Sequence, residues 1–148
     1  MLISTRGRYA LRVMIDMAEH DRGTYIPLKE IAARQEISEK YLENILPVLI
    51  RHGFLTGLRG KGGGYRLTRP PEEYTVGSVI KLVEGSIAPV ACVECQENVS
   101  GQCERAAVCR TLPMWKRLQG KLDEFFEGIT LADLGQDGGA GADLGLWM

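Results

Sequence analysis

The stretch from Ser38 to Leu67 constrains the fold of this chain more than any other part of the sequence. In its first half, apolar residues recur at positions i, i+3, i+4, i+7 and i+8, and these are Leu42, Ile45, Leu46, Leu49 and Ile50. That period predicts an amphipathic helix with a core beneath one face. Pro47 removes one helical hydrogen bond, but the apolar period continues beyond it, so we expect a kink and not an end. Two short strands, 54–58 and 65–68, should follow.

Two further helices precede this stretch. Apolar spacing predicts the first over 5–20 and the second over 28–35, and Ser38 is a suitable N-cap for the third. Helix, short turn and helix is the order of a helix-turn-helix. The loop 59–64, RGKGGG, then has the place of a wing. The expected fold is mainly α, a winged helix-turn-helix DNA-binding domain with a two-stranded wing plus a long C-terminal dimerisation helix.

A nucleotide-binding loop is the alternative for the glycine-rich segment, because such loops also cradle phosphates. The sequence lacks the G-x-x-x-x-G-K-[ST] pattern, and Pro70 and Pro71 block the helix that a phosphate-binding loop should begin. A wing is therefore the preferred interpretation, and a plain hairpin turn is the remaining one.

The distribution of charge agrees with a nucleic-acid contact in the first half. Residues 1–70 hold 12 Lys and Arg against 7 Asp and Glu, a net charge of +5, whereas residues 71–148 hold 6 against 12, a net charge of −6. Chance clustering of solvated charge is the alternative explanation. No apolar run approaches the ~20 residues that cross a bilayer, and the first residues lack a signal-peptide pattern. We expect a cytoplasmic protein without membrane contact.

The second half is predicted to hold a connector and a dimer helix. A helix over 75–84 precedes an irregular segment, and a strong helix begins at Thr111. Its apolar residues follow heptad spacing, and they are Trp115, Leu118, Leu122, Phe125 and Ile129. Packing on the same chain is one explanation; a homodimer is preferred, because so short a chain has little core left to cover them. The expected units are 1–70 (DNA-binding), 71–110 (connector helix and cysteine loop), 111–134 (dimerisation helix) and 135–148 (disordered tail).

All four cysteines lie in the irregular segment 86–110, called the cysteine segment below, with the spacing C-x2-C-x7-C-x5-C, and they are Cys92, Cys95, Cys103 and Cys109. The residues around them are polar and loop-like, so a ligand is needed to order them. Thiolates bind zinc and iron–sulfur clusters, and free thiols can instead switch by oxidation. The residues leave all three possibilities open, and the C-x2-C spacing taken alone favours zinc.

Five segments together resemble the Rrf-type family of bacterial transcription regulators, the group that includes IscR, NsrR and CymR. The segments are STRGRYAL at 4–11, ISEKYLENIL at 37–46, LRGKGGGYRL at 58–67, YTVGSVIKLVEG at 74–85 and CRTLPMW at 109–115. The resemblance covers about residues 1–134. It implies a homodimer whose long helices cross and whose two DNA-binding halves contact a palindromic operator in double-stranded DNA.

On matching positions, the resemblance places three groups of residues against DNA. The group at the major groove is Ser38, Lys40, Tyr41 and Glu43. The group in the wing is Arg59, Gly60 and Lys61. The group at the phosphates is Arg8 and Tyr9. Glu43 would accept a hydrogen bond from a cytosine amino group, and Arg59 would enter a narrow, A·T-rich minor groove.

The resemblance also favours an iron–sulfur cluster among the possibilities for the cysteines. Cluster-binding members of the family use three cysteines and a fourth ligand that is not cysteine. Cys103 and Cys109 match the last two cysteines, and either Cys92 or Cys95 matches the first. The chain departs from the pattern at Leu112, where some members have a histidine. We therefore expect a cluster of unspecified type held by the four cysteines, with zinc or no metal as alternatives.

Two classes of function follow from these patterns. The main hypothesis is a sequence-specific DNA-binding transcription regulator, repressor or activator, whose affinity depends on the cysteine segment. The alternative is a small metal or redox carrier that uses the helix-turn-helix as a scaffold. A cluster-free regulator that senses by zinc, by thiol oxidation or by a small effector is the other alternative. An enzyme is not expected, because the sequence offers no nucleophile–base pair and no histidine near the cysteines.

Overall fold

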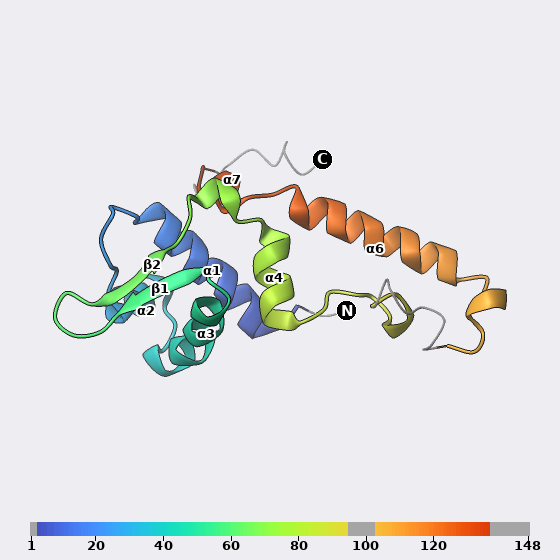
Figure 1. The fold of residues 1–148 in the computed structure, drawn as a ribbon, viewed down its shortest axis with the longest axis horizontal. Helices are drawn as coiled ribbons and strands as arrows, with labels where there is room; N and C mark the ends of the chain where they lie inside the picture. The colour runs from blue at the N-terminus through green and yellow to red at the C-terminus, as the bar shows by residue number, and fades with distance from the viewer. Residues whose placement is uncertain (1–2, 95–102, 137–148) are drawn as a thin grey trace.

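The computed structural model describes residues 3–94 and 103–136 (Figure 1). The helices are α1 (Thr5–Glu19), α2 (Leu28–Gln35), α3 (Glu39–Arg51), α4 (Val76–Glu84), α6 (Leu112–Glu127) and α7 (Leu131–Gln136). Strands β1 (Leu55–Leu58) and β2 (Gly64–Leu67) follow α3. Short 3-10 turns are η1 (Pro71–Glu73), η2 (Ala91–Val93) and η3 (Ala106–Val108). The predicted order of three helices, a two-stranded hairpin and a further helix is confirmed.

Side-chain oxygens cap the N-termini of three of these helices. Each accepts a hydrogen bond from the backbone amide three residues further along the chain. The distance from the amide nitrogen is 3.2 Å at Ser4 and at Ser38, and 2.9 Å at Thr75. The Ser38 cap, which the sequence predicts, fixes the first turn of α3.

Helix α3 continues through Pro47 to Arg51, as the apolar period predicts. Four residues of the predicted stripe are fully buried, and they are Leu42, Ile45, Leu46 and Leu49. The fifth, Ile50, is instead 37% exposed. The stripe therefore ends one residue early, and Ile50 is left at the surface beside the wing.

The core forms around α1, which packs against α2, α4 and α7. The buried apolar residues of α1 are Ala10, Val13, Met14 and Met17. Tyr74, Val79 and Leu131 belong to the same buried cluster. The core thus continues beyond residue 70, the position at which we expect the DNA-binding domain to end.

The wing is an antiparallel pair that runs from Leu55 opposite Leu67 to Leu58 opposite Gly64. Ile26, just before α2, adds an isolated bridge to Tyr65. The Ile26 amide donates to the Tyr65 carbonyl at 2.8 Å, and the Tyr65 amide donates to the Ile26 carbonyl at 2.9 Å. This bridge ties the hairpin to the helix-turn-helix.

The C-terminal helix differs from the prediction of one helix over 111–134. Helix α6 ends at Glu127, and the separate helix α7 begins at Leu131. Between them, Ile129 is buried with Val76 and Ile80 of its own chain, and its carbonyl accepts a hydrogen bond from the Val76 amide at 2.8 Å. The prediction that Ile129 continues the dimer seam is therefore wrong, because this residue closes the connection between α6 and α4.

Figure 1 shows α6 as an arm beside the winged-helix body, with its C-terminal end near α4 and its N-terminal end far from α1. No helix among the described residues is long and apolar enough to cross a membrane. Helix α7 reaches residue 136, two residues into the predicted tail. Residues 137–148 of that tail, and Cys95, lie outside the described residues.

Candidate nucleic-acid interface

The first turns of α3 present a polar face to solvent. Ser38, Lys40 and Glu43 are exposed, and Tyr41 is half-buried. The side-chain amide of Asn44 donates to the Lys40 carbonyl at 3.2 Å, so it lies along the helix. Recognition helices enter the major groove with N-terminal residues of this kind. The structure therefore brings all four residues of the predicted major-groove group together at one end of α3.

Aromatic and cationic contacts fix this end of α3 to α1 and α2. The rings of Tyr41 and Tyr9 meet edge to face, with centroids 5.3 Å apart and an interplanar angle of 70°. The Arg12 guanidinium lies 5.0 Å from the Tyr9 ring centroid, and Arg12 Nε donates to Gln35 Oε1 at 3.3 Å. Arg8, which is exposed, lies beside Tyr9 at the same edge of α1. Tyr9 therefore orients the recognition helix as well as lying at the predicted phosphate contact.

A buried carboxylate, Asp16, holds α2 against α1. Its side chain is 1% exposed, and its two oxygens accept from Arg34 Nε at 2.9 Å and Arg34 Nη2 at 2.8 Å. Gln35 Nε2 adds a third bond at 3.0 Å. Burial raises the pKa of Asp16, but the hydrogen bonds from Arg34 and Gln35 outweigh it, so the pKa is lowered overall. Asp16 was not among the residues predicted from the sequence, although it is a single acid among the apolar residues on the buried face of α1.

The wing loop depends on glycine at several positions. Gly60 and Gly62 have φ values of 92° and 75°, which residues with a side chain rarely adopt, and the Gly63 amide closes the turn on the Gly60 carbonyl at 3.0 Å. At Gly64, a Cβ would collide with the Ile26 carbonyl. The loop is thereby held close to the helix-turn-helix, with Lys61 exposed at its tip.

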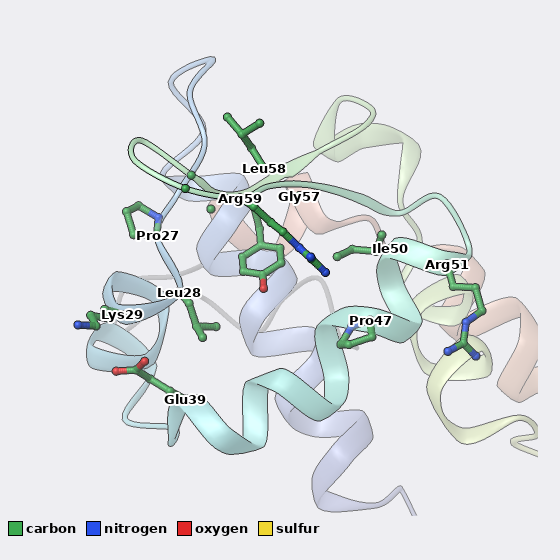
Figure 2. A pocket seen from close by; sticks show the side chains of 14 residues that line it. Pro27, Leu28, Lys29, Glu39, Pro47, Ile50, Arg51, Gly57, Leu58 and Arg59 are labelled. Atoms are coloured by element: carbon green, nitrogen blue, oxygen red, sulfur yellow. The ribbon is translucent and has the colours of Figure 1, made fainter.

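A groove of about 800 Å³ separates the wing from α3 and from the start of α2. Figure 2 shows Arg59 reaching from the wing toward Pro47 and Ile50, whereas Leu58 points the other way. Two basic residues that the sequence analysis missed also line the groove, Lys29 at the start of α2 and Arg51 at the end of α3. In the sequence, each of the two is a basic residue at or next to the end of a helix.

The three described cysteines lie along the connection between α4 and α6, and all have free thiols. Cys92 and Cys109 are half-buried, and Cys103 is exposed. Soft, accessible thiols are a donor set suited to an iron–sulfur cluster or zinc. Within residues 3–94 and 103–136, however, no three His, Cys, Asp or Glu residues lie close enough together to hold a metal ion. The donor chemistry fits a cluster, and Cys95 lies outside the described residues.

Cys109 is the thiol with the most distinctive surroundings. Its Sγ lies 3.4 Å from Thr111 Oγ1, at the beginning of α6. Hydrogen bonds from the Thr111 hydroxyl and from the backbone amides of Thr111 and Leu112 lower the pKa of Cys109. Its thiolate therefore forms more readily than that of an ordinary cysteine, and thiolates are the form that binds metals and reacts with oxidants.

The remaining residues of the predicted dimer seam lie on α6. Leu118 is 40% exposed and Phe125 is 48% exposed, while Trp115 and Leu122 are half-buried. None of these four belongs to the buried apolar clusters found among the described residues. The seam residues therefore form an apolar surface on α6 that stays at least partly accessible within the described part of the chain.

Comparison with known proteins places this architecture in one family. The family model Rrf2, an iron-dependent transcriptional regulator, matches residues 3–137. The HTH-type transcriptional regulator IscR of Vibrio cholerae is 35% identical over 137 residues, covering 93% of this chain and 76% of the relative. Protein rrf2 of Nitratidesulfovibrio vulgaris is 41% identical over 141 residues, covering 93% of this chain and 89% of the relative.

Solved structures agree with these sequence matches. CymR, the global cysteine regulator of B. subtilis, has a TM-score of 0.73 at 34% identity, with 92% of this chain and 97% of that chain covered. IscR of T. potens has a TM-score of 0.73 at 31% identity, with 100% of this chain and 97% of that chain covered. The winged-helix fold and the resemblance in the sequence are confirmed, and these relatives are transcription regulators and not enzymes. The chain belongs to the Rrf2 family of bacterial DNA-binding transcription regulators.

Proposed function

We propose that this protein acts as a homodimer that binds a palindromic site in double-stranded DNA, and that the state of its cysteine segment sets its affinity. One observation supports the DNA-binding part above the others. The N-terminal turn of α3 and the basic wing loop lie on opposite sides of one groove, with Glu39 on one side and Arg59 on the other. In duplex DNA, a major groove and a minor groove lie side by side with one phosphate backbone between them. The helix and the wing loop can therefore enter neighbouring grooves while the backbone lies in the groove between them.

Each group of the interface has its own task in this proposal. Lys40 and Glu43 read base edges from α3, where Glu43 accepts from a cytosine amino group. Ser38 and Tyr41 lie beside them at the major groove, and Tyr9 and Arg8 contact phosphates and position the helix. Gly60 and Lys61 bring the wing backbone against DNA, and Arg59 swings from the groove of Figure 2 into the minor groove.

The homodimer places two such interfaces on one operator. Trp115, Leu118, Leu122 and Phe125 of one α6 pack against the same residues of the partner, as a twofold interface requires. Two recognition helices related by that axis read half-sites that are inverted repeats of each other. The regulator acts on the chromosome, in the bacterial cytoplasm.

The cysteine segment is the proposed sensor. Cys92, Cys95, Cys103 and Cys109 would hold an iron–sulfur cluster, which supplies a centre that responds to oxidants and to the supply of iron and sulfide. The lowered pKa of Cys109 suits both ligation and direct thiol oxidation. Zinc or a metal-free thiol switch would use the same residues, and metal analysis distinguishes the three.

A DNA-binding measurement tests the first part of the proposal. Affinity for an operator duplex should fall steeply with salt, because a regulator releases counterions from the phosphates that it contacts. Arg59→Ala should weaken binding by about 1–3 kcal/mol. Lys121→Ala, which removes an equal charge from exposed α6, should leave binding unchanged. A protein that shows no salt-dependent duplex binding would instead be a carrier.

A second measurement tests the sensor. Protein purified without oxygen should contain matched iron and sulfide and show visible absorbance bands, and Cys103→Ser should lose both the bands and the response of DNA affinity. Zinc alone would make the segment a structural or thiol-sensing site. A Cys103→Ser variant that still releases DNA on oxidation would contradict the assigned role of this thiol.

A further inference from the structure

Helix α4 is held at each end by a glutamate carboxylate that lies against a glycine. At its C-terminal end, Glu84 Oε1 accepts from the Ser4 amide at 2.9 Å and from the Ser4 hydroxyl at 2.6 Å. A Cβ on the buried Gly7 would collide with this carboxylate. Ser4 also caps α1, so Glu84 is joined directly to the first turn of that helix.

The N-terminal end of α4 is held in the same way by α6. Glu127 Oε2 accepts from the Thr75 hydroxyl at 2.6 Å, and Glu127 Oε1 accepts from Lys81 Nζ at 3.1 Å. A Cβ on Gly77 would lie only 2.8 Å from Glu127 Cδ. The last turn of α6 is therefore seated on the first turn of α4, where glycine leaves the space.

Lys81 strengthens this junction through a second carboxylate. Its Nζ lies 2.9 Å from Asp123 Oδ1, and Gln119 Nε2 donates to Asp123 Oδ2 at 3.1 Å. The hydrogen bonds to Asp123 and then Glu127 raise the pKa of Lys81, and the Thr75 hydroxyl is the main cause that lowers the pKa of Glu127. The charged forms are thus favoured at neutral pH, and the junction stays intact there.

These two junctions make α4 a link between the arm and the DNA-binding body, beside α7, which also packs on α1. Helix α6 packs mainly on α4 and η2, while α4 packs on α1 and α3. The described cysteines lie between the C-terminal end of α4 and the N-terminal end of α6, because Cys92 follows α4, and Cys103 and Cys109 precede α6. A rearrangement of the cysteine segment would act first on α4 and α6, the two helices that it joins. A nine-residue helix, ~13 Å long, transmits such a shift as a rigid element.

We propose that Glu127 and Glu84 are positioning residues that carry a change in the cysteine segment through α4 to the first turn of α1. That turn holds Arg8 and leads to Tyr9, whose ring contacts Tyr41 on the recognition helix. The DNA readout of this inference rests on the proposed function, whereas the mechanical coupling does not. Coupling of this kind is reciprocal, so DNA binding also changes the α4–α6 junction.

Hydrogen exchange tests the mechanical coupling without DNA or metal. Glu127→Ala removes the contact of α6 with α4 and should speed amide exchange in residues 7–9, whose amides are hydrogen-bonded. We expect an increase of at least about fivefold, the lower end of usual coupling factors. Adding Glu84→Ala should give little further increase if the effect passes through α4, and a full further increase if it passes through α7, which also packs on α1. The control is Glu124→Ala, which removes the same charge from the same helix at an exposed pair with Lys121. Faster exchange confined to α6 and residues 75–77 would overturn the proposal.

DNA affinity supplies the second readout. The ratio of affinities between the two states of the cysteine segment should move toward one in Glu127→Ala and in Glu84→Ala, and stay at the wild-type value in Glu124→Ala. If Glu127→Ala and Glu84→Ala both keep the wild-type ratio of DNA affinities, the coupling is overturned. A wild-type protein with no ratio at all would contradict the proposed function, and the exchange experiment would still decide the role of α4.

Discussion

Asp16 is one residue that sets the geometry of a whole binding face. Its carboxylate fixes Arg34 and Gln35 at the end of α2. Gln35 in turn accepts from Arg12, whose guanidinium lies over the Tyr9 ring. A charge buried to this degree is costly unless it is paired, so the pair keeps α2 at one angle to α1. The short turn between α2 and α3 then fixes the orientation of the recognition helix relative to α1.

Replacing Asp16 by asparagine tests this arrangement. We expect the free energy of unfolding near neutral pH to fall by about 2 kcal/mol, because Arg34 loses a hydrogen-bonded charge. Folding lowers the pKa of Asp16, so its contribution is present above the ordinary value of 3.8 and is lost as the pH falls through the lower folded-state pKa. Urea unfolding at neutral and acid pH measures both effects. Asp21→Asn, in the exposed loop after α1, should show neither; equal losses would contradict the role of Asp16.

Tyr74 is a second residue whose importance lies in its hydrogen bonds. Its side chain is fully buried, its hydroxyl donates to the Phe54 carbonyl at 2.8 Å, and it accepts from the amides of Thr68 and Arg69 at 3.0 Å each. Tyr74→Phe leaves two amides without this acceptor, which should cost about 1–3 kcal/mol of stability. Thermal and urea unfolding measure the loss. Tyr25→Phe, at a half-buried position, should be neutral by comparison, and a neutral Tyr74→Phe would mean that water replaces the hydroxyl.

The wing is the element whose position depends most on a single close approach. At Gly64, where φ is +151°, a Cβ would lie 2.8 Å from the Pro27 nitrogen and collide with the Ile26 carbonyl. Gly64→Ala should therefore push the wing off its bridge and weaken operator binding about tenfold, with a strain of about 1–3 kcal/mol. Gly23→Ala is the control, because its φ is +77° but the space around it is open. Equal effects of both substitutions on DNA affinity would show that the bridge does not position the wing.

At the level of elements, periodicity predicted most of the fold and failed where contacts distant in sequence decide the outcome. The stripe from Leu42 to Leu49 and the glycines of the wing were sufficient for α3 and its hairpin. The heptad spacing from Trp115 to Ile129 could not reveal that the helix stops at Glu127. That end depends on the Ile129 carbonyl meeting the Val76 amide, a pairing that no local pattern contains. Gly128, directly after Glu127, was the one local feature of the sequence that indicated a helix end there.

The candidate site was predictable to the same degree. Of the predicted residues, Arg59 and Gly60 line the groove, opposite Glu39 of α3. The predicted α3 group lies on the first turns of that helix, outside the groove lining. Lys29 and Arg51 line that groove only because the chain folds the wing across both helix ends. The approach of Arg59 to Pro47 and Ile50 likewise depends on the anchor at Ile26 (Figure 2). Side chains brought together by tertiary contacts were therefore beyond the reach of spacing alone.

The whole molecule consists of a body with one DNA-binding face and an arm whose apolar seam is partly exposed. In the proposed dimer each body reads one half-site, so specificity for the full operator needs a second copy in a fixed orientation. The arm supplies that orientation in the proposed dimer, and α4 supplies its connection to the body. Affinity for the full site should therefore depend on α6 even though α6 touches no DNA in this arrangement.

Leu118→Glu tests that dependence. Leu118 is 40% exposed in the single chain, so the substitution should leave the body folded, but a dimer seam would have to bury the new charge. We expect the dissociation constant of the dimer to rise by about 100-fold or more, the equivalent of roughly 3 kcal/mol, as measured by analytical ultracentrifugation. Binding to a duplex with both half-sites should weaken, while binding to a single half-site should not. Arg117→Glu, an exposed α6 residue outside the seam, should remain dimeric. A Leu118→Glu protein that stays dimeric would place the subunit interface elsewhere on the molecule.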